Sequence, residues 1–381
     1  MPSRGASTNS VALIKVADIA RAYNFGSAHP LRPERVLLAY DHIRELGLVE
    51  LPHVREVAAR SATDGEILAV HDAEFVATVQ GIDDGTIPER RGLEFGLGTP
   101  DDPLFENMHL ASAAVCGASV VAAELVASGE TDYAFNPAGG LHHARAREAS
   151  GFCIYNDPAV AIARVLTMNP EWRVLYVDVD VHHGDGVQWI YYEEPRVLTV
   201  SLHQSGRYLY PGTGFEDEIG TAAGRGTAVN IPLLPLSGGD DYLWALETVL
   251  DAVAPVFYPD VLVTQLGADT HWGDPLANLG LTMTAYPRMA RQLHSCAQRF
   301  CSDRWIATGG GGYQFETLVP KIWTIHFAEM CGVADRIPSS WLEDRPPESV
   351  SRSYRPEVER SVGQVLEAVL PRLDALTVSR S

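Results

Sequence analysis

The chain has 381 residues, 46% of them hydrophobic, and a formal net charge of −20 at pH 7. This length and apolar content can bury a large core, whereas the negative charge and the lack of a basic cluster argue against a nucleic-acid partner. No segment is expected to span a membrane, so a membrane partner is not predicted either. An acidic surface would favour cationic substrates, although many soluble proteins are acidic for solubility alone.

The sequence shows no internal repeat, low-complexity run or long linker that would divide it. We therefore predict a single domain over residues 11–381, preceded by a disordered stretch over residues 1–10. The five cysteines are odd in number and form no CxxC pair, which is typical of reduced thiols in a cytoplasmic protein. The oligomeric state stays open, and an oligomer is possible.

The predicted helices and strands alternate along the chain. In order, we expect a helix over 107–128, a helix over 159–166, strands over 173–181 and 197–202, a helix over 241–253, a strand over 260–266, a helix over 285–300, a strand over 304–308 and a helix near 357–376. Asp157 and Pro158 are expected to begin the second helix as its cap and first turn. This alternation predicts an α/β fold with three layers, in which helices cover both faces of a mainly parallel sheet.

The most informative segment is the run LYVDVDVHHGD, which extends from Leu175 to Asp185. Its alternation of aliphatic and polar side chains is typical of a strand and would place Asp178, Asp180 and His182 on one face. An Asp beside a His at a strand end suits a divalent metal, and carboxylates this close repel unless a cation or proton separates them. A solvated edge strand with chance acids is the alternative, which the aliphatic surroundings disfavour.

A second motif, PAGGLHHA, begins at Pro137 and contains His142 and His143. A histidine pair is suited to acid/base chemistry near neutral pH, although such pairs often serve only packing. Asp178 and Asp185 are the carboxylates available to fix the tautomers of the two imidazoles.

Two further motifs follow apolar, strand-like runs. In QLGADTHWGD, Asp269 could supply a second carboxylate ligand, His271 is a rival ligand, and Asp274 is expected to be a turn residue. In TGGGGY, no lysine follows the glycines, so a phosphate-binding loop is disfavoured. Glycines packed beneath an active site that present the hydroxyl of Tyr313 explain both residue types.

Together, these motifs resemble those of the histone deacetylase family, over a region from about Tyr23 to Cys331. Supporting matches are the Gly151-Phe152-Cys153 triplet and the segment that begins at Tyr210, and residues 96–105 look most like bacterial acetoin-utilization-type deacetylases. The resemblance implies the arginase/deacetylase fold, with a sheet of about eight strands.

The resemblance also implies a role for each motif residue. The divalent metal, Zn²⁺ with Fe²⁺ or Co²⁺ as alternatives, would be held by Asp180, His182 and Asp269. The catalytic groups would be His142, His143 as the general base, Asp178, Asp185, and Tyr313 as the oxyanion donor. The substrate would contact Asp101 at the rim, Gly151, and the tunnel walls Phe152 and Tyr210. A structural K⁺ would be held by Asp178, Asp180, His182, Ser201 and Leu202, and Arg35 would lie near an internal cavity on the acetate side.

The resemblance thus implies a zinc-dependent hydrolase that deacetylates lysine side chains of proteins. An amidohydrolase for acetylpolyamines or other small N-acetyl amines is the alternative, and a catalytically weak metal-binding interaction protein is a further one. A ureohydrolase with two metals would need a second Asp two residues after Asp269, where His271 stands. Glu194 occupies a place expected to be small and neutral, which makes a second monovalent-cation site doubtful.

Overall fold

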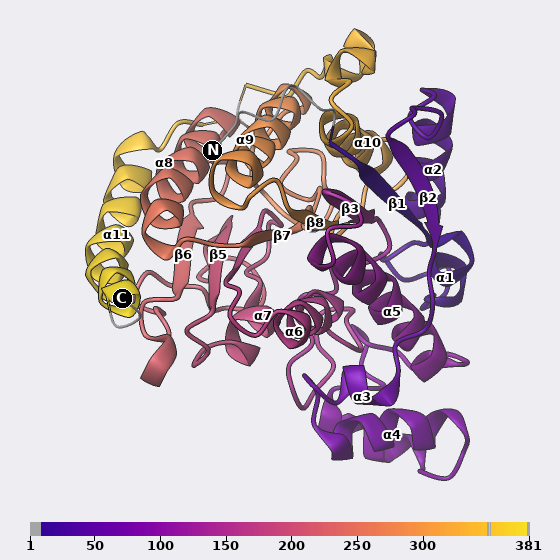
Figure 1. The fold of residues 1–381 in the computed structure, drawn as a ribbon. Coiled ribbons are helices and arrows are strands. Elements are labelled where there is room, and N and C mark those ends of the chain that lie inside the picture. Colours follow the sequence, from indigo (N-terminus) through magenta and orange to yellow (C-terminus); the bar gives the residue numbers. More distant parts are fainter. Residues whose placement is uncertain (1–8, 349, 351, 379–381) are drawn as a thin grey trace.

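Eight parallel strands form one sheet at the centre of the computed structural model (Figure 1), which describes residues 9–348, 350 and 352–378. Across the sheet the order is β2-β1-β3-β8-β7-β4-β5-β6, and every neighbouring pair is parallel. The strands are β1 (Val11–Lys15), β2 (Val54–Ala58), β3 (Tyr133–Asn136), β4 (Val174–Asp178), β5 (Val197–Gln204), β6 (Ala228–Leu233), β7 (Val261–Gln265) and β8 (Trp305–Thr308). The predicted α/β class and the sheet of about eight strands are confirmed.

Helices cover both faces of the sheet, which makes three layers. Figure 1 shows α5, α6 and α7 on one face and α8, α9 and α10 on the other, while α11 packs against α8 and the edge strand β6. The helices are α1 (Ala17–Ala22), α2 (Glu34–Glu45), α3 (Asp64–Ile67), α4 (Ala73–Asp83), α5 (Met108–Ala127), α6 (Asp157–Met168), α7 (Asp185–Ile190), α8 (Gly239–Phe257), α9 (Tyr286–Phe300), α10 (Leu318–Met330) and α11 (Arg355–Val378). Short 3₁₀ turns are η1 (Glu89–Phe95), η2 (Ala222–Gly224), η3 (Met283–Ala285), η4 (Ala334–Arg336) and η5 (Ser339–Leu342).

Double coverage explains why the central strands are apolar throughout. Every residue of β3, β4, β7 and β8 is buried, as expected for a parallel strand between two helical layers. Helix α5 is also almost entirely buried. By length and composition it could cross a membrane, contrary to the expectation from sequence, but 83% of its apolar window is buried in the interior, so it is a core helix here.

Two predicted boundaries are wrong. The strand predicted over 173–181 ends at Asp178, and the following residues form a loop. Helix α6 is capped by Asn156, whose side chain accepts the backbone N–H of Ala159. Asp157 instead turns inward and accepts the N–H groups of Gly140 and Leu141, 3.0 and 2.8 Å away, and so fixes the turn that precedes the histidine pair.

The two ends of the chain bear on the remaining predictions. Residues 1–8 of the stretch predicted to be disordered lie outside the described residues, whereas Asn9 and Ser10 donate hydrogen bonds to Tyr133 and Asp132. The helix expected near 357–376 lies within α11. A single domain over residues 11–381 stays a prediction. All five cysteines are buried and free.

Candidate active site

Four loops at the carboxyl edge of the sheet carry the predicted site residues. The loops follow β3, β4, β7 and β8, which are neighbours in the order β3-β8-β7-β4. Parallel strands all end at the same edge of their sheet, so the four sequence motifs meet there although they are far apart in the chain.

Asp180, His182 and Asp269 converge in the group expected to hold a metal. One ligand atom from each lies within 4.8 Å of the other two. Nδ1 of His182 is 3.0 Å from an oxygen of Asp180 and 3.4 Å from an oxygen of Asp269. Strand β4 ends at Asp178. Asp180 and His182 are therefore brought together by the path of the loop and not by the alternation of side chains along a strand.

Hydrogen bonds hold the two carboxylates from behind. Oδ2 of Asp180 accepts the Gln265 amide at 2.6 Å and the Gly311 N–H at 2.7 Å, while Oδ1 of Asp269 accepts the Val181 N–H at 2.8 Å. Oδ2 of Asp269 is buried and accepts no hydrogen bond, an arrangement that is costly unless a cation binds it. Burial and the charge of Asp180 raise the pKa of Asp269 to about 7. A divalent cation bound between the two carboxylates would relieve their repulsion. Two carboxylates and one imidazole therefore fit a divalent metal with open coordination positions.

Each histidine of the pair is backed by a carboxylate. Nδ1 of His142 lies 2.7 Å from Asp178, and Nδ1 of His143 lies 2.6 Å from Asp185. The two Nε2 atoms face each other at 3.1 Å. Since each Nδ1 donates to its carboxylate, one Nε2 donates to the other in this hydrogen bond, and these are the nitrogens that can exchange a proton with a bound molecule.

The surroundings separate the two histidines electrostatically. Burial disfavours a charge on His142, but Asp178 and Asp180 outweigh it and raise its pKa to about 9. Burial and the positive charge of His142 lower the pKa of His143 to about 4, against the opposing effect of Asp185. These opposite shifts favour the protonated form of His142 and the neutral form of His143, and a neutral imidazole is the form that can accept a proton.

Arg145 also contacts this group, although it was not among the residues predicted from the sequence. Its Nη2 lies 3.1 Å from Oδ2 of Asp185, while Oδ1 of the same carboxylate bonds to His143. The burial cost of this carboxylate is outweighed by His143 and Arg145, and the pKa of Asp185 is lowered. Nothing in the local sequence distinguishes Arg145 from other surface arginines, so only the fold could identify it.

An apolar tunnel leads to the metal group. Its cavity measures about 220 Å³ and is lined by Asp101, His143, Gly151, Phe152, His182, Leu209, Tyr210, Leu276 and Tyr313. The four residues expected to contact the substrate are thus brought together. Leu209 and Leu276 were not predicted from the sequence, although Leu276 lies only two residues after Asp274.

The aromatic walls of the tunnel stand edge-on to the groups below them. The Tyr210 ring is 5.0 Å from that of His143, and the Phe152 ring is 5.7 Å from that of Tyr313. The Tyr210 hydroxyl is hydrogen-bonded to the hydroxyl of Ser150. Gly151 has φ +53°, and a Cβ there would lie 2.5 Å from the His143 ring, so this position requires glycine.

The glycine run places Tyr313 and leaves room for the metal group. A Cβ at Gly311 would lie 2.0 Å from Oδ2 of Asp269. Only glycine therefore lets the backbone pass this close to the carboxylate. The N–H of Tyr313 donates to Asp274 at 2.7 Å. Asp274 also accepts the N–H of Leu276 and thus forms a turn, as expected, but it additionally anchors Tyr313.

Arg35 lies beneath the same run, in the place that the resemblance suggests. It is buried and donates to the carbonyl oxygens of Gly310 and Gly312 at 2.6 and 3.2 Å. It lines a small inner cavity that also contacts His142 and Tyr313.

The residues expected to hold K⁺ lie on adjacent segments. Ser201 of β5 pairs with Asp178 of β4, and the Leu202 carbonyl accepts the hydroxyl of Tyr242 at 3.1 Å. Potassium binding by Asp178, Asp180, His182, Ser201 and Leu202 stays a prediction. Glu194 is paired with Arg196 at 2.7 Å.

The interpretation of His271 as a rival metal ligand is wrong. Its Nε2 lies 3.0 Å from Asp344, its Nδ1 accepts the N–H of Gly273, and it is not part of the metal group. The ring is turned away because Asp344, far along the chain, supplies a partly buried acceptor that no local pattern reveals.

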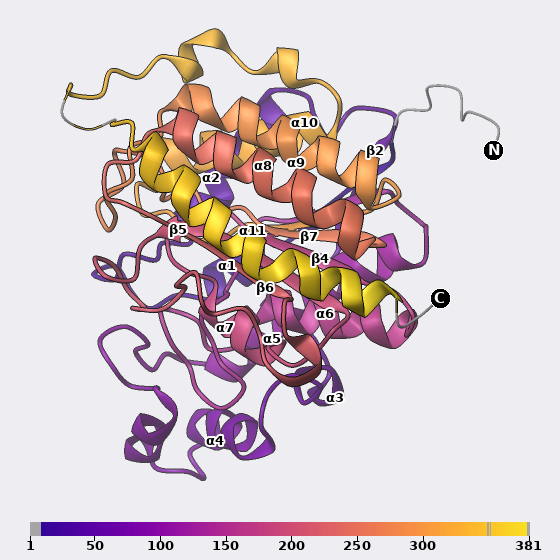
Figure 2. The same cartoon turned by 90° about the vertical axis from the view of Figure 1, so that its left-hand side faces the viewer.

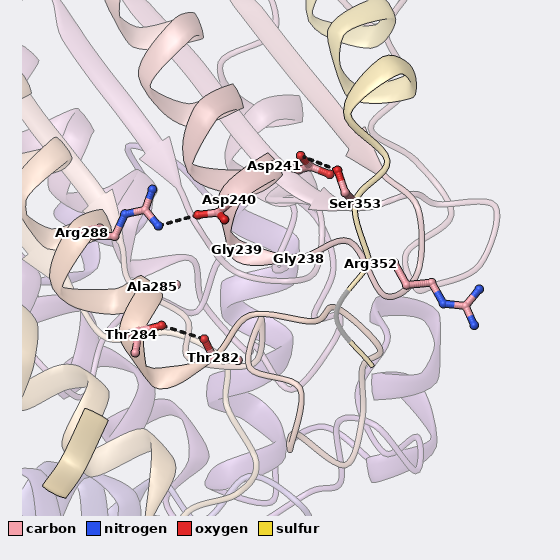
Figure 3. A pocket seen from close by; sticks show the side chains of 10 residues that line it. All are labelled: Gly238, Gly239, Asp240, Asp241, Thr282, Thr284, Ala285, Arg288, Arg352 and Ser353. Carbon is pink, nitrogen blue, oxygen red and sulfur yellow. Dashed lines mark hydrogen bonds and ion pairs between the residues drawn. The ribbon is translucent and has the colours of Figure 1, made fainter. Parts of the chain in front are cut away.

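Another pocket lies where the start of α8 meets the segment before α11 (Figure 3). Its carboxylates are already paired, Asp240 with Arg288 and Asp241 with Ser353, and the Arg352 side chain extends away from it. The lining residues are Gly238, Gly239, Asp240, Asp241, Thr282, Thr284, Ala285, Arg288, Arg352 and Ser353. None of the predicted site residues lines it.

Comparisons with known proteins agree with this geometry. The model of the histone deacetylase domain matches residues 29–330. The acetoin utilization protein AcuC of Bacillus subtilis is 41% identical over 324 residues, covering 84% of this chain and 83% of that protein. AcuC of Staphylococcus xylosus is 32% identical over 328 residues, covering 85% and 84%.

Solved structures of similar proteins extend the comparison to the fold. A crystal structure of an HDAC homolog complexed with SAHA is 30% identical with a TM-score of 0.81, covering 94% of this chain and all of that chain. The crystal structure of an HDAC homolog from Aquifex aeolicus gives the same identity, coverage and TM-score.

Proposed function

This chain belongs to the histone deacetylase family, and from that premise we propose that it removes acetyl groups from acetylated lysine side chains of proteins. The observation that carries the proposal is the convergence of Asp180, His182 and Asp269 at the end of an apolar tunnel, beside two carboxylate-backed histidines. This combination suits hydrolysis of an amide at the tip of a long, unbranched alkyl chain.

The tunnel supports a substrate of that shape. Phe152 and Tyr210 offer aromatic walls, and Leu276 adds an aliphatic surface near the opening. Such walls favour the methylene groups of a lysine side chain, since apolar contacts stabilise CH₂ groups that leave water. Asp101 is exposed and lines the same cavity, and we propose that its carboxylate accepts N–H groups of a peptide backbone.

Asp180, His182 and Asp269 would hold the metal. When bound, a divalent metal supplies a Lewis acid that polarises the amide carbonyl and makes water more acidic. Its identity is proposed as Zn²⁺, with Fe²⁺ or Co²⁺ as alternatives because carboxylate ligands suit all three. The same proposal includes a structural K⁺ held by Asp178, Asp180, His182, Ser201 and Leu202.

The chain's own groups account for the proton transfers. Nε2 of His143 accepts a proton from the attacking water, while Asp185 holds the ring and balances the charge that forms. Water adds to the amide carbon, the C–N bond breaks, and the amine leaves with a proton returned by the histidine pair. The hydroxyl of Tyr313 donates to the oxyanion that develops on the carbonyl oxygen.

The acidic chain also suits a cationic small molecule, so an acetylpolyamine amidohydrolase is the alternative. We further propose a cytoplasmic enzyme with an acetylated protein or acetylated amine as its partner, without nucleic-acid or membrane partners, and with an oligomer possible.

The proposal is tested by kcat/KM of metal-reconstituted protein on an acetyl-lysine peptide, acetylputrescine and acetylspermidine. We expect the peptide to be preferred. Preference for the polyamines would indicate that the protein is an amidohydrolase for small molecules. No turnover of any of the three at one metal ion per chain would contradict the deacetylase assignment.

A further inference from the structure

A carboxylate beyond the matched domain reaches into the active-site loops. Asp344 follows η5, in the segment between α10 and α11 that Figure 2 shows passing over the helices α8, α9 and α10. A single oxygen, Oδ2, accepts Nε2–H of His271 at 3.0 Å, Nε1–H of Trp272 at 2.9 Å and the N–H of Met283 at 3.0 Å. Its side chain is only 13% exposed.

The His271 ring links Asp344 to the loop over residues 271–276, because its second nitrogen is hydrogen-bonded within that loop. Since Nδ1 accepts the Gly273 N–H at 3.0 Å, the ring is the neutral tautomer that donates through Nε2 to Asp344. The His271 carbonyl accepts the N–H of Asp274 at 3.0 Å, so ring and backbone of one residue fix the turn.

The fixed turn then reaches the tunnel at two points. Oδ2 of Asp274 accepts the N–H of Tyr313 at 2.7 Å, and Oδ1 accepts the N–H of Leu276 at 2.9 Å. Both Tyr313 and Leu276 line the tunnel. A continuous series of hydrogen bonds thus connects Asp344 with the proposed oxyanion donor and with one tunnel wall.

We propose that Asp344 is a positioning residue that sets the placement of Tyr313 and Leu276 through the 271–276 loop. The inference rests on the proposed function for its kinetic consequence, but not for its structural one. Two N–H donors of the loop, on His271 and Trp272, share one oxygen with the N–H of Met283, which leaves the loop little freedom. A hydroxyl aimed at a developing oxyanion needs such restraint.

Asp344→Ala removes all three hydrogen bonds and tests the inference kinetically. We expect kcat/KM on the acetyl-lysine peptide to fall by about 10- to 100-fold at unchanged metal content, in the range of a small misplacement of catalytic groups. Asp344→Asn keeps an acceptor oxygen for the same donors and should recover most of the activity. The neighbouring Glu343 is exposed, so Glu343→Ala is the matched control and should leave kcat/KM unchanged.

A double-mutant comparison distinguishes positioning from general destabilisation. If Asp344 acts through the hydroxyl of Tyr313, the loss caused by Asp344→Ala should be much smaller in the Tyr313→Phe background. The same fold-loss in both backgrounds would overturn the inference. An Asn variant no more active than the Ala variant would also count against it, because the acceptor would then be irrelevant.

Hydrogen exchange measured by mass spectrometry separates this inference from the proposed function, since it needs no turnover. In Asp344→Ala, peptides covering residues 271–276 and Tyr313 should exchange faster, while peptides from the core helix α5 should not change. Unchanged exchange at Tyr313 would overturn the inference even if the wild-type enzyme is active. Faster exchange in a protein without deacetylase activity would support the positioning role and contradict the proposed function. If the Ala variant does not fold, His271→Phe removes the ring hydrogen bonds to Asp344 and Gly273 and is compared with Glu343→Gln by the same measurement. Faster exchange at Tyr313 in His271→Phe supports the inference, and unchanged exchange would overturn it.

Discussion

Gly311→Ala is expected to disrupt the metal group without straining the backbone. Gly311 does not adopt a left-handed conformation, so alanine fits its backbone angles, but the added Cβ would lie 2.0 Å from Oδ2 of Asp269 and 2.6 Å from Oδ2 of Asp180. Favourable contacts of a carbon atom begin at roughly 3.5 Å. One or both carboxylates must therefore move by about 1 Å or more.

A shift of that size exceeds what metal coordination tolerates. Ligand distances in protein sites vary by only about 0.2 Å, and disturbing the groups that orient ligands typically weakens metal affinity by about 10- to 100-fold. Because Asp269 and Asp180 are themselves displaced, we expect the upper end of this range or a complete loss of binding.

The affinity is measured by calorimetric titration of the metal-free protein with Zn²⁺ and by the metal content after dialysis, with circular dichroism to verify folding. Gly363→Ala is the matched control, because nothing lies within 4 Å of a Cβ there and the residue is in helix α11. A folded Gly311→Ala protein that binds one Zn²⁺ with wild-type affinity would show that the two carboxylates do not need a glycine beside them.

Three other outcomes are expected. Tyr313→Phe should lower kcat by about 10²- to 10³-fold with metal content and KM little changed, because only an oxyanion donor is lost; near-normal kcat would remove its role. His143→Ala should reduce kcat/KM at least as much as His142→Ala, and the opposite ranking would exchange their roles. The third concerns stability. His326 is fully buried with both ring nitrogens unpartnered, and burial lowers its pKa from 6.5 to about 3. At this residue the folded protein binds fewer protons than the unfolded chain, so its contribution to stability falls as pH falls, by about 1 to 2 kcal/mol between pH 6.5 and 5. Urea unfolding of His326→Leu should show a pH dependence shallower by that amount, and parallel curves for the two proteins would contradict it.

The sequence was sufficient wherever a pattern is local. The apolar runs of β4, β5, β7 and β8 predicted the strands because both faces of each are covered, and the residues that follow them carry the site. The strands β1, β2, β3 and β6 were missed. They have four to six residues, whereas β4, β7 and β8 have four or five, so strand length does not explain the difference.

Contacts between distant segments could not be predicted. Asp178, Asp180 and His182 alternate as in a strand, yet the strand ends at Asp178. Beyond it, the N–H groups of residues 180, 181 and 182 donate to aspartate side chains and not to a neighbouring strand. His271 has the spacing of a ligand, but its partner Asp344 is 73 residues away. Arg145 behind Asp185 was missed for the same reason.

The central claim, a deacetylase with one catalytic metal, is tested most directly by titrating metal-free protein with Zn²⁺ and measuring acetate release from an acetyl-lysine peptide. We expect acetate production to rise linearly and to saturate at one Zn²⁺ per chain, and Asp180→Asn to show neither binding nor release. Acetate release that is independent of added metal and resistant to chelators, or no release at full metal occupancy, would contradict it.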